Sequence, residues 1–237
     1  TASFLLELED WGAELGLHLH PQDYGYADYL GGYTLEEQKN MLEEACTLWS
    51  EALGKRPQSF RGGNFSANDA TFPALAGCGF RQGSLSVPGR SFTRVKSNWA
   101  GGSMQPYHAH PANRLLAGAL DFLEIPVTAD WESVMWGGLT KLELRLEMVD
   151  ARSHGFTIRK NVDRQLDAGV EHPYLLALTH NIFDYSNPAE FRRQVLDGVL
   201  DEIDRYAGEK ELQKTGFTLA AYHERVDRET ERGGHGK

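Results

Sequence analysis

The stretch LGLHLHPQD, residues 15–23, ends a short apolar run with two histidines, His18 and His20. Residues i and i+2 of an extended strand point to the same face, so the two imidazoles are expected to lie side by side. This spacing is typical of a divalent-metal site. An HxH pair also occurs by chance, with one ring bonded to the backbone and the other solvated, so the surrounding sequence has to separate the two interpretations.

Helices and strands alternate around this stretch. A helix is predicted over 3–14, before the histidine strand, and another over 34–54, where Thr34 and Glu37 form a capping box. Further strands are predicted at 57–61, from Phe80 onward, at 122–127, at 174–180 and at 216–220, and further helices at 66–80, 154–168 and 188–208. Residues 86–113 predict a long loop, and the last residues a frayed polar tail. The alternation predicts a single α/β domain over residues 1–237, with a mostly parallel sheet that forms a barrel.

The composition is that of an ordinary globular protein. Of 237 residues, 41% are hydrophobic and 24% are charged, and no run approaches the roughly 20 apolar residues that span a bilayer. The formal net charge of −10 argues against a nucleic-acid partner, because such proteins need clustered Lys and Arg. Cys46 and Cys78 are expected to be buried free thiols. Since no signal peptide is visible, the expected location is cytoplasmic.

Ionisable side chains stand where the predicted strands end. The strand at 58–61 ends in Arg61, the strand at 174–179 leads to His180, and the strand at 122–127 leads to Asp130 and Trp131. In parallel α/β folds the working residues gather at the C-terminal ends of the strands, where the loops open. Each residue also has a structural interpretation: an ion pair for Arg61, a helix cap for Asp130, the core for Trp131 and a backbone contact for His180.

Taken in order, the segments GLHLHP, SFRGGNFS, EIPVTADW and LLALTHN resemble the polysaccharide deacetylase family, also called the NodB-homology domain, over nearly the whole chain. The resemblance implies an irregular (β/α) barrel. It also implies a hydrolase that removes N- or O-linked acetyl groups from a carbohydrate, using a divalent metal bound by one aspartate and two histidines. Zinc is the expected metal, with cobalt and nickel as alternatives.

The same resemblance assigns roles by position. His18 and His20 match the metal histidines, Arg61 the arginine of the active-site wall, and His180 the late-strand histidine that acts as general acid. We expect Asp130 to orient His180 as a catalytic carboxylate. The residues expected to contact the carbohydrate are Asn64, Phe65 and Trp131.

Three features depart from the family pattern. The metal histidines are two residues apart instead of four, and the arginine loop lacks its usual prolines. The acidic strand that supplies a metal ligand and the catalytic base has no counterpart, because the nearest acids, Glu9 and Asp10, fall within a predicted helix. We therefore expect the chain to be truncated at its N-terminus.

Other functions stay open at the level of sequence. A carbohydrate-binding protein that has lost catalysis would keep the same fold, and other metal-dependent amidohydrolases or phosphoesterases also place HxH at a strand end. A second HxH pair, His108 and His110, rivals the first for the metal, but it lies in the predicted loop and is interpreted as substrate-side. The remaining histidines, including His223, suggest no role.

Overall fold

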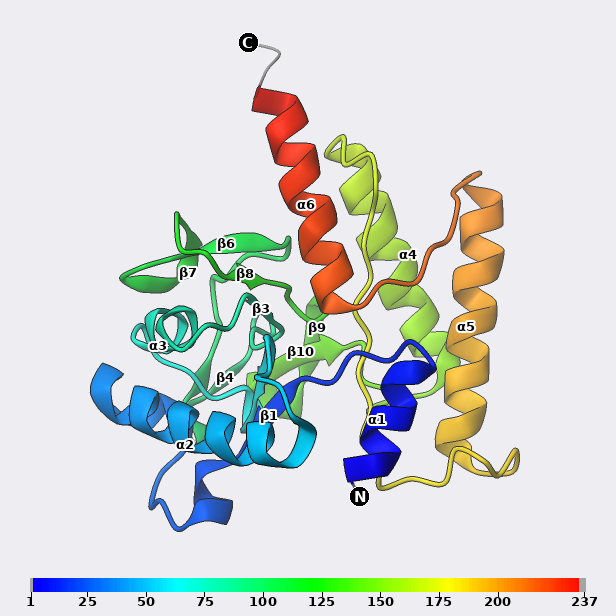
Figure 1. Ribbon diagram of the computed structural model, residues 1–237. Helices are drawn as coiled ribbons and strands as arrows, with labels where there is room; N and C mark the ends of the chain where they lie inside the picture. The colour runs from blue at the N-terminus through cyan, green and yellow to red at the C-terminus, as the bar shows by residue number, and fades with distance from the viewer. Residues whose placement is uncertain (1, 235–237) are drawn as a thin grey trace.

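The centre of the molecule is a six-stranded sheet, seen in the computed structural model, which describes residues 2–234 (Figure 1). Its strand order is β1-β2-β3-β8-β6-β7. The first four strands in that order are parallel: β1 (Leu17–Leu19), β2 (Ser59–Gly62), β3 (Gln82–Gly83) and β8 (Leu123–Glu124). The last two, β6 (Tyr107–His110) and β7 (Asn113–Ala117), are antiparallel to their neighbours.

Beyond β8 the barrel wall continues as irregular extended chain. Thr128 N donates to Leu176 O at 3.1 Å, and Leu144 N donates to Thr128 O at 2.7 Å. A parallel bridge joins Arg145 to Leu178 in the segment 174–180. Within residues 2–234 no backbone pairing joins this segment to β1, so the barrel stays open along the outer edge of β1.

Helices cover this sheet on two sides. In Figure 1, α2 and α3 lie beside the parallel strands, α4 and α5 lie side by side and run in the same direction on the opposite side, and α6 runs past β6 and β8. The helices are α1 (Ala2–Asp10), α2 (Leu35–Leu53), α3 (Thr71–Gly77), α4 (Ala151–Asp167), α5 (Phe191–Glu209) and α6 (Leu219–Gly234). Two small hairpins complete the fold: β4 (Ser91–Phe92) with β5 (Ser97–Asn98), and β9 (Ala129–Met135) with β10 (Thr140–Glu143).

Two apolar clusters hold these layers together. The larger one lies between the sheet and helices α2 and α3, and its aromatic centre is Phe60, Phe72, Phe80, Trp99 and Phe122. The smaller one joins α4 and α5 to the wall segment at 144–146 through Leu144, Ile158, Val195 and Val199. Burial of such side chains stabilises each by about 1.5–3 kcal/mol relative to exposure. The mixed α/β class expected from the sequence is confirmed.

Several sequence expectations have clear structural outcomes. The helix over 34–54 is confirmed, with the Thr34–Glu37 capping box and Gly54 in the left-handed conformation at its end. Both cysteines are buried and free. The strand predicted at 216–220 is wrong, because α6 begins at Leu219 and continues through most of the polar tail; residues 235–237 lie outside the described residues. The loop predicted over 86–113 contains β4, β5 and β6.

Candidate functional site

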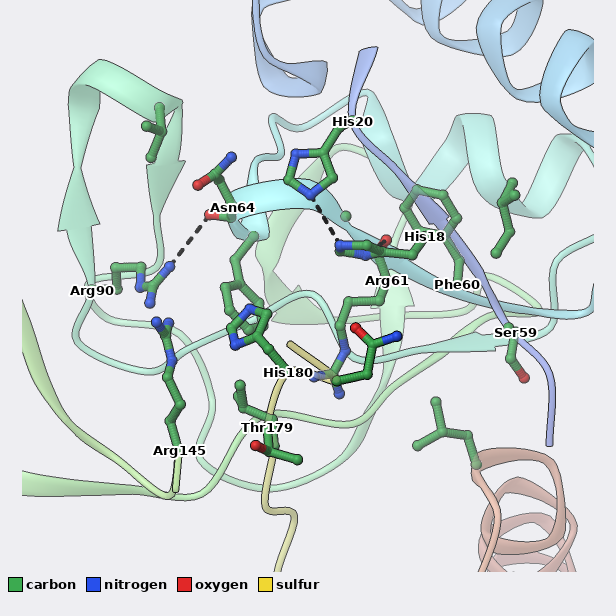
Figure 2. A pocket seen from close by; sticks show the side chains of 18 of the residues that line it. His18, His20, Ser59, Phe60, Arg61, Asn64, Arg90, Arg145, Thr179 and His180 are labelled. Carbon is green, nitrogen blue, oxygen red and sulfur yellow. Dashed lines mark hydrogen bonds between the residues drawn. The ribbon is translucent and has the colours of Figure 1, made fainter. Parts of the chain in front are cut away.

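A pocket of about 670 Å³ opens at the C-terminal ends of β1 and β2 (Figure 2). It contains six of the residues that the sequence assigned to the site: His18, His20, Arg61, Asn64, Phe65 and His180. They come from β1, from β2 with the turn that follows it, and from segment 174–180, which are far apart in sequence. Parallel pairing aligns these strand ends, since His18 lies opposite Arg61 in the register.

The two pocket histidines face each other through their Nε2 atoms, which lie 3.0 Å apart. His18 Nδ1 lies 2.9 Å from the carbonyl oxygen of Arg61, which can only accept, so the proton is on Nδ1 and the lone pair on Nε2. Burial lowers the pKa of His18; the hydrogen bond to Arg61 opposes this, while His20, Arg61 and His180 lower the pKa further. His18 is therefore neutral at pH 7, as a metal ligand must be.

The donor set suits a transition metal but is incomplete. When two imidazole nitrogens bind one ion at about 2.0–2.1 Å each, the distance between them is close to the distance observed between the two Nε2 atoms. No aspartate or glutamate of residues 2–234 lines the pocket. The histidine pair could therefore supply two ligands to a metal ion, but the pocket lacks the carboxylate that the family resemblance implies.

A carboxylate does hold His180, but it is Glu147. His180 Nδ1 lies 2.9 Å from Glu147 Oε1, which also accepts from the His180 backbone N–H at 2.6 Å and from Thr179 Oγ1 at 2.9 Å. Burial raises the pKa of Glu147, but hydrogen bonds from its own backbone, His180 and Thr179 outweigh it and lower the pKa overall. Glu147 is thus ionised at pH 7 and keeps the Nδ1 proton in place, as orienting carboxylates do for catalytic histidines.

Arg61 offers a guanidinium to the pocket. Among the described residues its side chain makes no hydrogen bond, and the central carbon of its guanidinium, Cζ, lies 5.7 Å from the centre of the Phe65 ring. Burial lowers the pKa of Arg61, and Glu124 opposes this shift. A partly buried cation without a hydrogen-bond acceptor is free to bind a polar substrate group.

The turn after β2 is held in place by Arg90, a residue that the sequence analysis missed. Arg90 Nη1 donates to the Asn64 carbonyl at 3.3 Å, and its guanidinium stacks 4.7 Å from the centre of the Phe65 ring. Asn64 and Phe65 both have positive φ, at 55° and 57°, a conformation that non-glycine residues adopt only when surrounding contacts enforce it. Arg90 lies in the region predicted as loop, where no periodicity marks it.

The charge of Arg90 is balanced beneath the pocket. Glu143 is fully buried and pairs with Arg90 Nε at 3.1 Å and with Arg145 Nη2 at 2.8 Å. Two arginines thus share one carboxylate. This leaves the pocket with a positive balance from Arg61 and this cluster.

Asp130 and Trp131 lie outside the pocket. Both Asp130 oxygens accept from Lys160 Nζ at 3.1 Å, and the Trp131 ring lies 5.3 Å from the Arg164 guanidinium. The expected contact between Asp130 and His180 is not present, because Asp130 belongs to hairpin strand β9 and is engaged by α4. Sequence reasoning could not find Glu147, since it stands in no strand pattern and no motif.

A second group of potential ligands lies elsewhere. His108 on β6 and His223 and Asp227 on α6 place three ligating atoms within 4.8 Å of one another, so this cluster could bind a metal ion. The sequence drew attention to His108 through its HxH spacing. His223 and Asp227 were missed because the helix that carries them was not predicted.

Comparison with known proteins gives a match in fold only. No protein-family profile and no curated protein matches this chain. A solved structure of a protein assigned as a polysaccharide deacetylase from Pseudomonas aeruginosa PAO1 aligns with a TM-score of 0.51 at 14% identity. The alignment covers 94% of this chain and 62% of that chain. Another, from Mycobacterium smegmatis, aligns with a TM-score of 0.49 at 16% identity, covering 90% of this chain and 68% of that chain.

This chain spans less than two thirds of the Pseudomonas protein. A structural match at such low sequence identity shows a shared fold and does not show a shared chemistry. The resemblance drawn from four short segments is confirmed at the level of architecture: this chain has the mixed α/β fold of the polysaccharide deacetylases.

Proposed function

We propose that this chain is the catalytic part of a metal-dependent hydrolase that removes N- or O-linked acetyl groups from a carbohydrate. The observation that carries the proposal is the convergence of His18, His20, Arg61 and His180 in one pocket at the strand ends. Strand-end clustering of this kind is where parallel α/β folds place their chemistry.

In this proposal His18 and His20 hold the metal, which would be zinc, cobalt or nickel. When bound, such a metal polarises an acetyl carbonyl and lowers the pKa of a water molecule. The site also requires a carboxylate ligand and a general base, which no pocket residue of the described chain supplies. A second cavity of about 1020 Å³ lies beside β1, an edge strand of the sheet, and extends from Gly12–Gly16 to residues 171–177.

His180 is proposed as the general acid. Glu147 fixes the proton on Nδ1, so Nε2 is the atom that exchanges a proton with the departing amine or alcohol. A positioned imidazolium contributes typically about 10²–10⁴-fold to such a step. Arg61 and the turn at Asn64 and Phe65 position the substrate, and the exposed ring of Trp136, which also lines the pocket, offers an apolar face to a sugar ring.

The absence of a carboxylate from the pocket lining favours a second candidate, a carbohydrate-binding protein without catalysis. One experiment separates the two. Acetate release from a panel of acetylated glycans is measured with the natural full-length protein and zinc, beside a variant with His18→Ala and His20→Ala. If the protein is a hydrolase, acetate release should be lost in this variant and retained in the surface variant Glu132→Gln, which serves as the active control. Glycan binding without acetate release would establish the binding protein instead.

A further inference from the structure

We propose that His108, His223 and Asp227 form a structural site for a divalent transition metal, which ties helix α6 to strand β6. The site lies at the opposite end of the sheet from the pocket. His108 pairs with Leu123, the first residue of β8, and His223 contacts Gln82, the first residue of β3. The pocket opens at the other ends of the parallel strands; its lining reaches Ser59 and Leu219, the first residue of α6, but includes none of the three proposed ligands.

A directional chain of hydrogen bonds fixes the tautomer of His223. The Glu14 carboxylate accepts from the Ser59 hydroxyl, and Ser59 Oγ accepts from Gln82 Nε2 at 2.6 Å. The other amide atom, Gln82 Oε1, must therefore accept from His223 Nδ1, which lies 3.0 Å away. The proton is on Nδ1, and Nε2 carries a lone pair.

Among the described residues, no hydrogen-bond donor faces that lone pair. His223 is 3% exposed, and its Nε2 is buried with no hydrogen-bond partner in residues 2–234. Nε2 lies 3.4 Å from Asp227 Oδ2, so a lone pair faces a carboxylate oxygen. A cation between the two atoms converts this repulsion into two bonds. A second-shell partner on the other ring nitrogen, here Gln82, is the usual companion of a metal-bound histidine.

The third ligand completes a suitable geometry. His108 Nε2 lies 3.0 Å from Asp227 Oδ1, and all three ligating atoms lie within 4.8 Å of one another. Ligands bonded to one tetrahedral zinc at about 2.0–2.2 Å stand about 3.3 Å apart, which falls within the observed spread. Two imidazoles select zinc, cobalt or nickel over calcium or magnesium. The side chains of His108 and Asp227 are 31% and 41% exposed, which leaves access for the ion and for a water ligand.

The position of the site explains what the metal would do. His223 is the one buried side chain among residues 219–229 of α6, so apolar packing alone holds this helix weakly. Its first turn is anchored by Glu14, which accepts from the Ala220 backbone N–H at 3.0 Å. A metal bound one turn further along adds a link between segments more than 100 residues apart in sequence, and so stabilises the closed packing of α6 on the sheet.

The test uses the full chain, stripped with a chelator and then titrated with zinc. Calorimetry should find a site that Asp227→Asn removes and that the pocket variant His18→Ala/His20→Ala retains. At about 100 times the dissociation constant, zinc should raise the Tm of the wild type by about 5–10 °C. The Asp227→Asn variant should show a smaller rise, while Glu132→Gln, a surface control away from α6, behaves as the wild type.

Cobalt gives an independent readout, because its visible absorption reports nitrogen and oxygen ligands in a low-symmetry site. His108→Ala, which alters a partly exposed strand residue, serves as a second variant, and circular dichroism verifies that each variant is folded. Unchanged zinc stoichiometry and unchanged cobalt absorption in folded Asp227→Asn and His108→Ala would overturn the proposal. Neither readout depends on acetate release, so this inference stands or fails separately from the proposed hydrolase.

Discussion

Glu147 determines which nitrogen of His180 carries the proton, although the residue itself does not line the pocket. The change Glu147→Gln removes the charge and allows the amide to present a donor to Nδ1. We expect kcat for acetate release to fall on the order of 10²-fold or more, because the ring loses its preferred tautomer. Steady-state measurement of acetate release by the zinc-loaded protein tests this.

The matched control for that change is Glu132→Gln, an exposed carboxylate that pairs with Lys160 at the surface. It should leave kcat within about twofold, since exposed ion pairs contribute little. If Glu147→Gln lowers only the folding stability and leaves kcat intact, Glu147 is a structural partner of segment 174–180.

A second residue makes stability depend on pH. Burial raises the pKa of Glu124 to about 7, although hydrogen bonds from Ser86 and Leu85 oppose the shift. The folded state therefore binds a proton that the unfolded state releases above its ordinary pKa of 4.5. The free energy of unfolding falls as the pH rises from about 4.5 to about 7, by at most about 3 kcal/mol from this group.

The variant Glu124→Gln tests this slope. Urea denaturation at pH 5 and pH 8 should show that the wild type loses more stability over this interval than the variant does, whatever constant penalty the amide adds at both pH values. Equal losses in the two proteins would show that Glu124 is ionised throughout the interval. The comparison uses only the change in unfolding free energy between the two pH values in each protein. The Glu124 Oε2 atom, which has no hydrogen-bond partner among the described residues, therefore does not affect the sign of the result.

At the scale of the elements, the β9–β10 hairpin and the loop that carries Arg90 are held together by a buried charge cluster. Glu143 is the single carboxylate between Arg90 and Arg145. The change Glu143→Gln leaves two arginines near the core without their counterion and should destabilise the fold by about 3–5 kcal/mol. Guanidinium denaturation measures the loss, and the surface change Glu132→Gln should fall within about 1 kcal/mol of the wild type.

A small effect of Glu143→Gln would mean that water reaches Arg90 and Arg145 easily. In that case Arg90 would hold the turn at Asn64 and Phe65 less firmly, and the hydrogen bond from Trp99 Nε1 to the Phe65 carbonyl at 2.9 Å would remain to support it. Crystallography of the variant would show whether the left-handed conformation of the turn survives.

How far the sequence predicts an element depends on where its stabilisation arises. Helix α2 carries its own boundary signals, Thr34 with Glu37 at one end and Gly54 at the other, and it was predicted correctly. Helix α6 has a polar sequence with few apolar positions, and local ion pairs such as Arg225 with Glu229 support it along with tertiary contacts to Gln82. The apolar letters at its start therefore suggested a strand.

At the scale of the whole molecule, the sequence could predict those pocket residues that stand at the ends of predicted strands. His18, His20, Arg61 and His180 line one pocket, as the sequence led us to expect, because parallel strands bring their C-terminal ends together. Glu147 and Arg90 were not predicted, because irregular chain brings them to the pocket and such chain has no periodicity to detect. Asp130 was misplaced for a related reason: the chain after β8 turns into the β9–β10 hairpin and carries Asp130 toward α4.

The two candidate metal sites lie at opposite ends of one sheet, so a substitution at one site is expected to leave the properties of the other unchanged. Asp227→Asn should reduce the zinc-induced rise in Tm while kcat for acetate release, measured well below the Tm, stays within about twofold. The pocket change His18→Ala/His20→Ala should abolish turnover while the rise in Tm persists. Because the sites share no residue, the stability effects of the combined variant should add within about 0.5 kcal/mol. A coupling above 1 kcal/mol, measured by a double-mutant cycle in urea, would show instead that the sheet transmits strain between its two ends, so that α6 influences the pocket.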